Sequence, residues 1–121
     1  MATNEVIAPT KHRSLVCSDP TTPAAGDPVV CGQIPGVALR AEYTDGPLSG
    51  ETTVALDGVF NLSVKGVDGS GNSAVAKGDI LYYVAADTPK LSKKATGVRF
   101  GYAAATVGSS STATIAVEIG Y

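Results

Sequence analysis

GDPVV, residues 26–30, begins a series of three short apolar runs that continues with PGVAL at 35–39 and SGETTVAL at 49–56. Each run is bounded by glycine, proline or aspartate, which favour turns and interrupt helices. Short runs rich in valine and threonine between such breaks are typical of β-strands. These residues therefore predict a unit of short strands joined by tight turns.

The same unit recurs later in the chain. The matching segments are Gly36-Val37 with Gly97-Val98 and 53–56 with 114–117, both at an offset of 61 residues, and Gly26-Asp27 with Gly78-Asp79 at an offset of 52. Internal repeats set the architecture of a protein, so they are sought before single motifs. We interpret the chain as an internal duplication, with repeat-like halves at about 26–65 and 78–119.

A set of motifs in a fixed order resembles a known family. The set comprises GDPVV at 26–30, GVA at 36–38, GET at 50–52, DGVFNL at 57–62, AKGD at 76–79 and LYY at 81–83. In this order the motifs resemble the capsid decoration, or cement, proteins, which are small head proteins of tailed bacteriophages. The resemblance runs from about Ala24 to Glu118.

The resemblance implies a structural virion protein without enzymatic activity. Decoration proteins of this kind sit on the outer surface of the mature, expanded head, commonly at three-fold positions, where they stabilise the capsid lattice against internal DNA pressure. The partner implied is the major capsid protein. We expect a homotrimer, with about one copy for each major capsid subunit.

Length and composition favour one small β-domain. Fourteen glycines and seven prolines among 121 residues argue against long helices. We predict an all-β fold of about eight short strands, as a single-domain β-barrel or a two-sheet sandwich, because both architectures share this strand pattern. The N-terminal arm and first short strand are expected at 1–19 and the β-domain at 20–121.

Local signals predict where the strands and turns lie. Strands are expected at 14–17, 28–31, 37–42, 51–56, 60–65, 80–84, 98–102 and 114–119. Pro35-Gly36 fits a type II turn, and Asp57-Gly58 is a strong signal for a hairpin. We further expect a helical turn at 73–77 and a loop at 86–95.

The register of one strand is predicted to be firmly fixed. Phe60, Leu62 and Val64 alternate with polar residues, so all three are expected to face inward. The exit strand at 37–42 is also read as alternating, with Val37 and Leu39 on one face.

Charge and hydropathy exclude two classes of partner. Nine basic and eleven acidic residues give a formal charge of −2, which provides no electrostatic footprint for nucleic acid. The N-terminus lacks a basic region followed by an apolar run, and no apolar run reaches the eighteen residues expected of a membrane span. We therefore expect a soluble protein that is made in the host cytoplasm and binds neither nucleic acid nor membrane.

The sequence predicts no catalytic, cofactor-binding or metal site, and hence no enzyme and no cofactor. The one histidine, His12, lies near the arm, and no Gly-x-Ser-x-Gly nucleophile elbow occurs. The glycine-rich segment 66–72 is read as a mobile hairpin tip, since no Lys-Ser or Lys-Thr follows at Walker spacing. Cys17 and Cys31 lack metal-ligand spacing and are interpreted as reduced, half-buried thiols, with a disulfide between them as the alternative.

Two groups of residues are candidates for protein contacts. The predicted capsid-contact arm carries Val6, Ile7, Lys11 and Arg13, and the predicted subunit interface carries Tyr82 and Tyr83. An arm that adds to a neighbouring sheet edge gains main-chain hydrogen bonds, and tyrosine is enriched at interfaces. The other interpretation of the two tyrosines is a position at the edge of the core, where the ring is buried and the hydroxyl reaches water.

Two other function classes would require features of their own. A β-barrel binding module for a glycan or a host-surface ligand would need a cluster of exposed aromatic side chains. A nucleotide-dependent recombination factor would need a Walker-type loop and a basic face, and the sequence contains neither.

Overall fold

The structure, a computed structural model, describes residues 12–47 and 49–119. Within these residues it contains strands and no helix, so the predicted all-β fold is confirmed and no helix long and apolar enough to cross a membrane is present there. The strands are β1 (His12–Leu15), β2 (Pro28–Cys31), β3 (Ile34–Ala38), β4 (Thr52–Ala55), β5 (Gly58–Asp68), β6 (Gly71–Asn72), β7 (Ile80–Tyr83), β8 (Leu91–Lys93), β9 (Val98–Ala103) and β10 (Thr112–Ile119).

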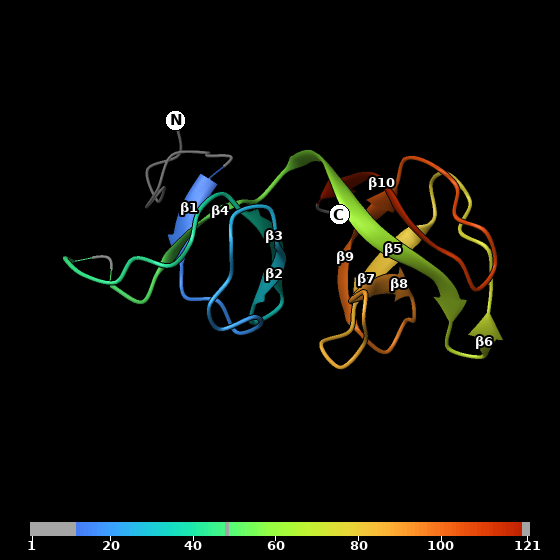
Figure 1. Ribbon diagram of the computed structural model, residues 1–121, viewed down its shortest axis with the longest axis horizontal. Helices are drawn as coiled ribbons and strands as arrows, with labels where there is room; N and C mark the ends of the chain where they lie inside the picture. Colours follow the sequence, from blue (N-terminus) through green and yellow to red (C-terminus); the bar gives the residue numbers. More distant parts are fainter. Residues whose placement is uncertain (1–11, 48, 120–121) are drawn as a thin grey trace, which may run out of the picture.

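The strands form two sheets that lie side by side (Figure 1). The first four make the N-terminal sheet, in the order β1-β4-β3-β2, with antiparallel neighbours throughout. The barrel runs β10-β9-β7-β8-β5 and closes because β10 also pairs with β5. The predicted barrel is therefore found in the second part of the chain, and a separate four-stranded sheet replaces the sandwich alternative.

Asp57-Gly58 does not form the predicted hairpin. The strands on either side of it belong to different sheets, because β4 pairs with β1 and β3 whereas β5 pairs with β10. The β5–β10 ladder runs over eight residue pairs, from Gly58–Ile119 to Lys65–Thr112. Gly58 adopts a φ of +109°, which a side chain resists, and the chain passes here from the N-terminal sheet to the barrel.

The turn between β2 and β3 also differs from the prediction. It is centred on Gly32-Gln33, with Gly32 at a φ of +66°, while Pro35-Gly36 lies inside β3. Glycine is required at position 36 for space: a Cβ there would lie 2.7 Å from the Ala55 carbonyl oxygen and 2.3 Å from a Val54 methyl carbon. The glycine therefore marks a close approach of β3 to β4 and not a turn.

Three other local predictions were wrong, for the segments 73–77, 86–95 and 37–42. The segment 73–77 forms no helical turn, because Val75 is bridged to Val107. The predicted loop 86–95 contains β8, which lies between β7 and β5. β3 ends at Ala38, so the alternation expected over 37–42 fails and Leu39 is 39% exposed.

The glycine-rich segment and the long strand before it follow the prediction more closely. Residues 66–72 form a hairpin between β5 and β6. Leu62 and Val64 are buried and Phe60 packs against the same core, so the predicted inward face is confirmed.

The two sheets share a hydrogen-bonding pattern at the turns before β2 and β7. The Gly26 amide donates to the Ala38 carbonyl at 2.7 Å, and the Gly78 amide donates to the Ala103 carbonyl at 2.7 Å. Both glycines have a positive φ, 90° and 93°. In each case the amide of the same alanine donates back, at 2.9 Å, to the carbonyl of the aspartate that follows the glycine.

The same pattern identifies the residue equivalent to Gly36. Gly36 lies opposite Val29 on β2, and Gly101 lies opposite Leu81 on β7. A Cβ on Gly101 would lie 2.1 Å from the Glu118 carbonyl oxygen, the same kind of close approach as at Gly36. Gly36 therefore corresponds to Gly101 and not to Gly97, so the offset of 61 is wrong for this strand. The duplication itself stays an interpretation.

Two hydrophobic cores sit beneath these strands. The larger core fills the barrel, is built around Tyr83 and Phe100, and also takes in Val30 and Val37 from the N-terminal sheet. The smaller core consists of Cys17, Val29, Ala38 and Val54. Because two valines of the N-terminal sheet reach the larger core, the sheet and the barrel are packed together through apolar contacts.

Candidate functional site

A polar joint connects the N-terminal sheet to the barrel. Asp19 lies between β1 and β2, Tyr83 belongs to β7, and Lys90 directly precedes β8. The Tyr83 hydroxyl donates a hydrogen bond to the Asp19 carboxylate, and the Lys90 ammonium lies 2.8 Å from the same Oδ2 atom. We call these three residues the joint.

The electrostatics of the joint favour an ionised Asp19. Burial opposes ionisation of this carboxyl, but the hydrogen bonds from Lys90 and Tyr83 outweigh it and hold the pKa of Asp19 below its usual value. For Tyr83, burial and then the neighbouring Asp19 carboxylate raise the pKa well above the usual range. The joint is therefore a carboxylate held by a neutral hydroxyl and a cation.

An aromatic stack and a cation–π contact hold the barrel side of the joint in place. The Tyr83 ring stacks on Phe100 with 6.3 Å between ring centroids, and the Lys90 ammonium lies 5.5 Å from the Tyr83 ring centroid. Tyr83 is only 2% exposed, so its hydroxyl is fixed by the core around its ring.

A groove of about 260 Å³ runs beside the joint. Its lining from the N-terminal sheet is Pro20, Asp27 and Pro28, and its lining from the barrel is Ser63, Pro89 and Lys90. Proline rings give the groove stiff apolar walls. Such a surface suits contact with an apolar or extended segment of another protein.

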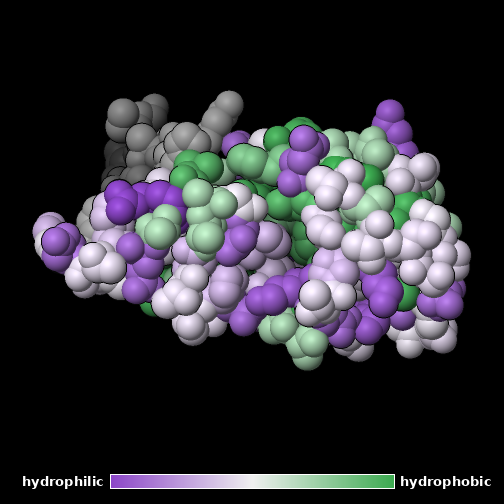
Figure 2. All heavy atoms as spheres, viewed as in Figure 1, coloured by the Kyte–Doolittle hydropathy of each residue, from purple (hydrophilic) through white to green (hydrophobic). Residues whose placement is uncertain are grey.

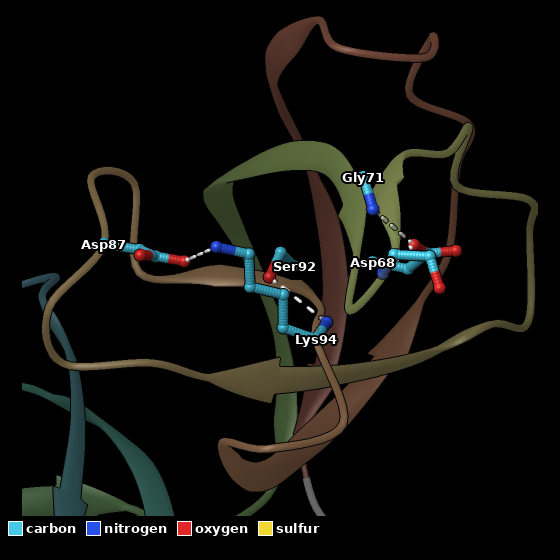
Figure 3. A network of polar contacts seen from close by, with 6 residues as sticks. Asp68, Gly71, Asp87, Ser92 and Lys94 are labelled. Atoms are coloured by element: carbon cyan, nitrogen blue, oxygen red, sulfur yellow. Dashed lines mark hydrogen bonds and ion pairs between the residues drawn. The ribbon is translucent and has the colours of Figure 1, made fainter.

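A second, more polar hollow of about 210 Å³ opens on the barrel between β5 and the segment before β8. Lys94 and Asp87 face each other across it at 2.7 Å (Figure 3). Nearby, the β5–β6 tip is held by Asp68, whose Oδ1 accepts hydrogen bonds from the amides of Ser70 and Gly71 at 2.8 and 3.1 Å. These bonds, chiefly the one from Ser70, hold the pKa of Asp68 below its usual value. The polar groups here hold the loops in place.

Large apolar side chains are exposed at four described positions, three of which lie on or directly after strands of the N-terminal sheet. They are Val16 (68%), Val59 (59%), Ile34 (42%) and Leu39 (39%). Figure 2 shows hydrophobic residues gathered along the upper side of the molecule, over the link from β4 to β5, while the lower side is mostly intermediate to hydrophilic. Exposed apolar residues of this kind are available for contact with another protein.

Comparison with known proteins identifies the family. A family model described as phage cement protein matches residues 7–119. The chain belongs to the phage cement protein family. The match spans both the N-terminal sheet and the barrel, and it confirms the resemblance found in the sequence. No curated protein and no solved structure matched the chain.

Family membership gives this cement protein a structural role at the phage capsid. Within the described residues, no group of three or more histidine, cysteine, aspartate or glutamate side chains is placed to hold a metal ion.

The predicted contact residues of the cement protein have different surroundings. Val6, Ile7 and Lys11 lie outside the described residues. Arg13 is exposed on β1, opposite Val54 of β4. Its role in capsid contact stays a prediction.

The two tyrosines of the predicted subunit interface also differ from each other. Tyr82 is half-buried on β7, where it pairs with Ser92 and Arg99. Tyr83 is buried and takes part in the joint, so it lacks the exposure that a contact between subunits needs. The subunit-interface prediction is therefore carried forward with Tyr82 alone.

The sequence does not predict the joint of this cement protein. Asp19 falls in a stretch that is predicted to be a loop, and nothing local distinguishes it from the other aspartates at turns. The signal that was present is the run Ile80–Tyr83, in which a tyrosine falls at a fully buried position and so needs a hydrogen-bond partner for its hydroxyl.

The two cysteines of the cement protein lie close together as free thiols. Their sulfur atoms are 3.6 Å apart, with Cys17 buried and Cys31 half-buried. Burial, and then the neighbouring Cys17, raises the pKa of the Cys31 thiol to about 12. The prediction of free thiols agrees with the structure, and for Cys17 the burial is more complete than predicted.

Proposed function

We propose that this cement protein binds the outer surface of the mature phage head and stabilises the lattice of major capsid protein subunits. The family match over residues 7–119 is the observation that carries the proposal. The structure supplies a physical mechanism, because a protein that braces a shell must itself resist bending between its contact points.

The joint and the shared core provide that resistance. Only the short link between β4 and β5 connects the N-terminal sheet to the barrel along the chain. Where the N-terminal sheet meets the barrel, the Asp19 carboxylate is bound by Tyr83 and Lys90. Val30 and Val37 of the sheet also pack into the core of the barrel. A capsid contact on the N-terminal sheet and a contact between subunits on the barrel would thereby be held at a fixed separation.

The N-terminal sheet is proposed as the side that contacts the capsid. It carries exposed Arg13 on β1 and exposed Val16 directly after it, and it follows the segment that holds Val6 and Ile7. We further propose that the protein acts as a homotrimer, with Tyr82 at the contact between subunits.

A head-protection assay tests the stabilising role. Expanded heads that lack the protein are mixed with it and heated, and DNA release is followed with a fluorescent dye. We expect release at a higher temperature with the protein than without it. An Arg13→Glu variant should protect less, whereas Lys77→Glu, a charge reversal at an exposed barrel position, should protect fully. Equal release with and without the protein would contradict the proposed function.

The glycan-binding alternative gains no support from the side chains. Among the aromatic residues that the structure describes, every side chain is half-buried or buried. A sugar-stacking surface needs exposed rings, so the head-surface role is the function that the described residues favour.

A further inference from the structure

The side chains of Cys17 and Cys31 lie close enough for a disulfide bond to form between them. Cys17 follows β1 and is 6% exposed, within the small core of the N-terminal sheet. Cys31 ends β2 and is half-buried. Their Sγ atoms are 3.6 Å apart, and a disulfide bond is about 2.05 Å long, so the sulfur atoms need to approach by only about 1.5 Å.

The backbone on both sides of the pair is already fixed. The Ser18 amide donates to the Val30 carbonyl at 2.9 Å, and the Val30 amide donates to the Asp19 carbonyl at 3.0 Å. The Gly32 amide donates to the Ser18 hydroxyl at 2.7 Å. These bonds hold the residues next to each cysteine together, so the remaining approach falls to side-chain rotation.

We propose that Cys17 and Cys31 form an oxidisable dithiol, which closes to an intramolecular disulfide when the protein meets a low-molecular-weight disulfide such as oxidised glutathione. Cys31, the more exposed thiol, loses its proton and attacks one sulfur of the oxidant, which releases one molecule of reduced glutathione. The buried Cys17 then loses its proton and attacks the resulting mixed disulfide at Cys31, which releases the second. Overall, two protein thiols are oxidised to one disulfide and one glutathione disulfide is reduced to two thiols.

A metal site is the competing use of two neighbouring thiols. Zinc in structural sites takes four ligands, commonly cysteine and histidine. Among the described residues, no third histidine, cysteine or carboxylate joins this pair in a group that could hold a metal ion. The geometry therefore favours oxidation to a disulfide.

The disulfide would stabilise the less well packed part of the molecule. Among the residues that the structure describes, the small core of the N-terminal sheet has four buried members. The larger core has fourteen, of which all but Val30 and Val37 belong to the barrel part of the chain. A bond between residues 17 and 31 restricts the unfolded chain and ties the segment after β1 to β2. If the protein acts on virions, which rests on the proposed function, this bond would form once particles leave a reducing cytoplasm.

The test uses the purified full chain and needs no capsids, so its outcome is independent of the proposed function. Reduced protein is incubated with oxidised glutathione at pH 8.5 and quenched with acid. Cleavage before Asp19 and Asp27 separates the two cysteines into the peptides 1–18 and 27–44, and mass spectrometry under non-reducing conditions then detects any link between them. We expect these two peptides to be joined by a disulfide bond, and the intact monomer to lose the mass of two hydrogen atoms. The melting temperature should rise by several degrees and should return to its original value when the disulfide is reduced.

Cys31→Ser is the control, since it removes the more exposed thiol and leaves the small core intact. Circular dichroism checks its fold, and its melting temperature should not rise on oxidation. In the unaltered protein, a reductant that reverses the rise in melting temperature shows the effect of the disulfide without any variant. The proposal is overturned by two free thiols after prolonged oxidation, by glutathione retained on either cysteine, by a disulfide between chains, or by an internal disulfide that leaves the melting temperature unchanged.

Discussion

Asp19 and Tyr83 lie 64 residues apart in the chain and meet in a hydrogen bond at the seam between the N-terminal sheet and the barrel. Lys90 completes the contact at 2.8 Å from the same carboxylate oxygen. A single covalent link joins the two sheets, so this joint and the apolar packing of Val30 and Val37 set their relative position. A cement protein needs such a fixed geometry if it is to hold capsid subunits in register.

Replacing Asp19 with asparagine should lower the free energy of unfolding by about 1 kcal/mol, because it removes the charge that Lys90 and Tyr83 bind while keeping the size of the side chain. The value lies below the range of about 1.5–3 kcal/mol that is usual for hydrogen bonds to charged groups, because the joint is partly solvent-exposed. Urea denaturation measures the change. Asp45→Asn, in an exposed loop, is the matched control and should leave stability nearly unchanged. Equal stability of Asp19→Asn and the unaltered protein would show that the joint contributes nothing.

The contribution of Asp19 should depend on pH in a defined direction. Its pKa in the folded protein is lowered from 3.8, so the folded state favours the ionised carboxylate. This stabilisation is fully present above pH 4–5 and is lost as the pH falls through 3.8 towards the lower folded-state pKa. The stability difference between the unaltered protein and Asp19→Asn should therefore shrink below pH 4. A difference that stays constant from pH 7 to pH 3 would contradict the assignment.

Gly36→Ala and Gly101→Ala should both destabilise the protein by on the order of 1–3 kcal/mol, the usual range for overpacking. In each case the new Cβ meets a backbone carbonyl oxygen, at 2.7 Å from Ala55 and 2.1 Å from Glu118. Gly69→Ala is the control, because nothing lies within 4 Å of a Cβ there. Thermal melting followed by circular dichroism compares the three variants. A Gly101→Ala protein that melts with the control would mean that β9 and β10 lie further apart than described.

Alkylation should detect the protonated state of the Cys31 thiol. With a pKa of about 12, this thiol is almost wholly protonated at pH 8.5, so iodoacetamide should label it on the order of 10–100-fold more slowly than an ordinary cysteine. In the folded protein the rate at which iodoacetamide labels Cys31 should keep rising beyond pH 10. In the protein unfolded in urea, this rate should level off near pH 9. Labelling is located by mass spectrometry of the peptide 27–44. A plateau near pH 9 in the folded protein would refute the raised pKa.

Local patterns predicted those features of the fold that depend on neighbouring residues. Alternation placed Phe60, Leu62 and Val64 on the inner face of β5, and turn-forming residues at Gly26-Asp27 and Gly78-Asp79 marked two equivalent turns. The ordered motifs also led to the correct family. These predictions succeed because each depends on neighbouring residues. Burial of one face of a strand requires alternating apolar residues, and a positive φ at a turn favours glycine.

Strand pairing could not be predicted from such local signals, because it depends on contacts between residues that are far apart in the sequence. Asp57-Gly58 has the composition of a hairpin, yet β5 buries its inner face by pairing with β10, and the chain crosses between sheets at this point. The repeat was likewise aligned on the dipeptide Gly97-Val98, although the insertion that contains β8 moves the equivalent of Gly36 to Gly101.

The candidate site was predicted only in part for the same reason. Arg13 is exposed as a contact residue should be, but Val6, Ile7 and Lys11 fall outside the described residues. Tyrosine is common both at the edge of a core and at interfaces, so the sequence leaves the position of Tyr83 open between the two. In the structure Tyr83 is buried and its hydroxyl donates a hydrogen bond to Asp19. That partner lies before β2 and has no sequence signature of its own.

Direct binding to heads tests whether this cement protein attaches to the head surface. Expanded heads that lack the cement protein are incubated with increasing amounts of it and sedimented, and the bound copies per head are counted. We predict saturation at a whole-number ratio to the major capsid subunit, with binding lost after deletion of residues 1–10 while the truncated protein still folds. Failure of the folded, full-length protein to sediment with the heads would contradict the account.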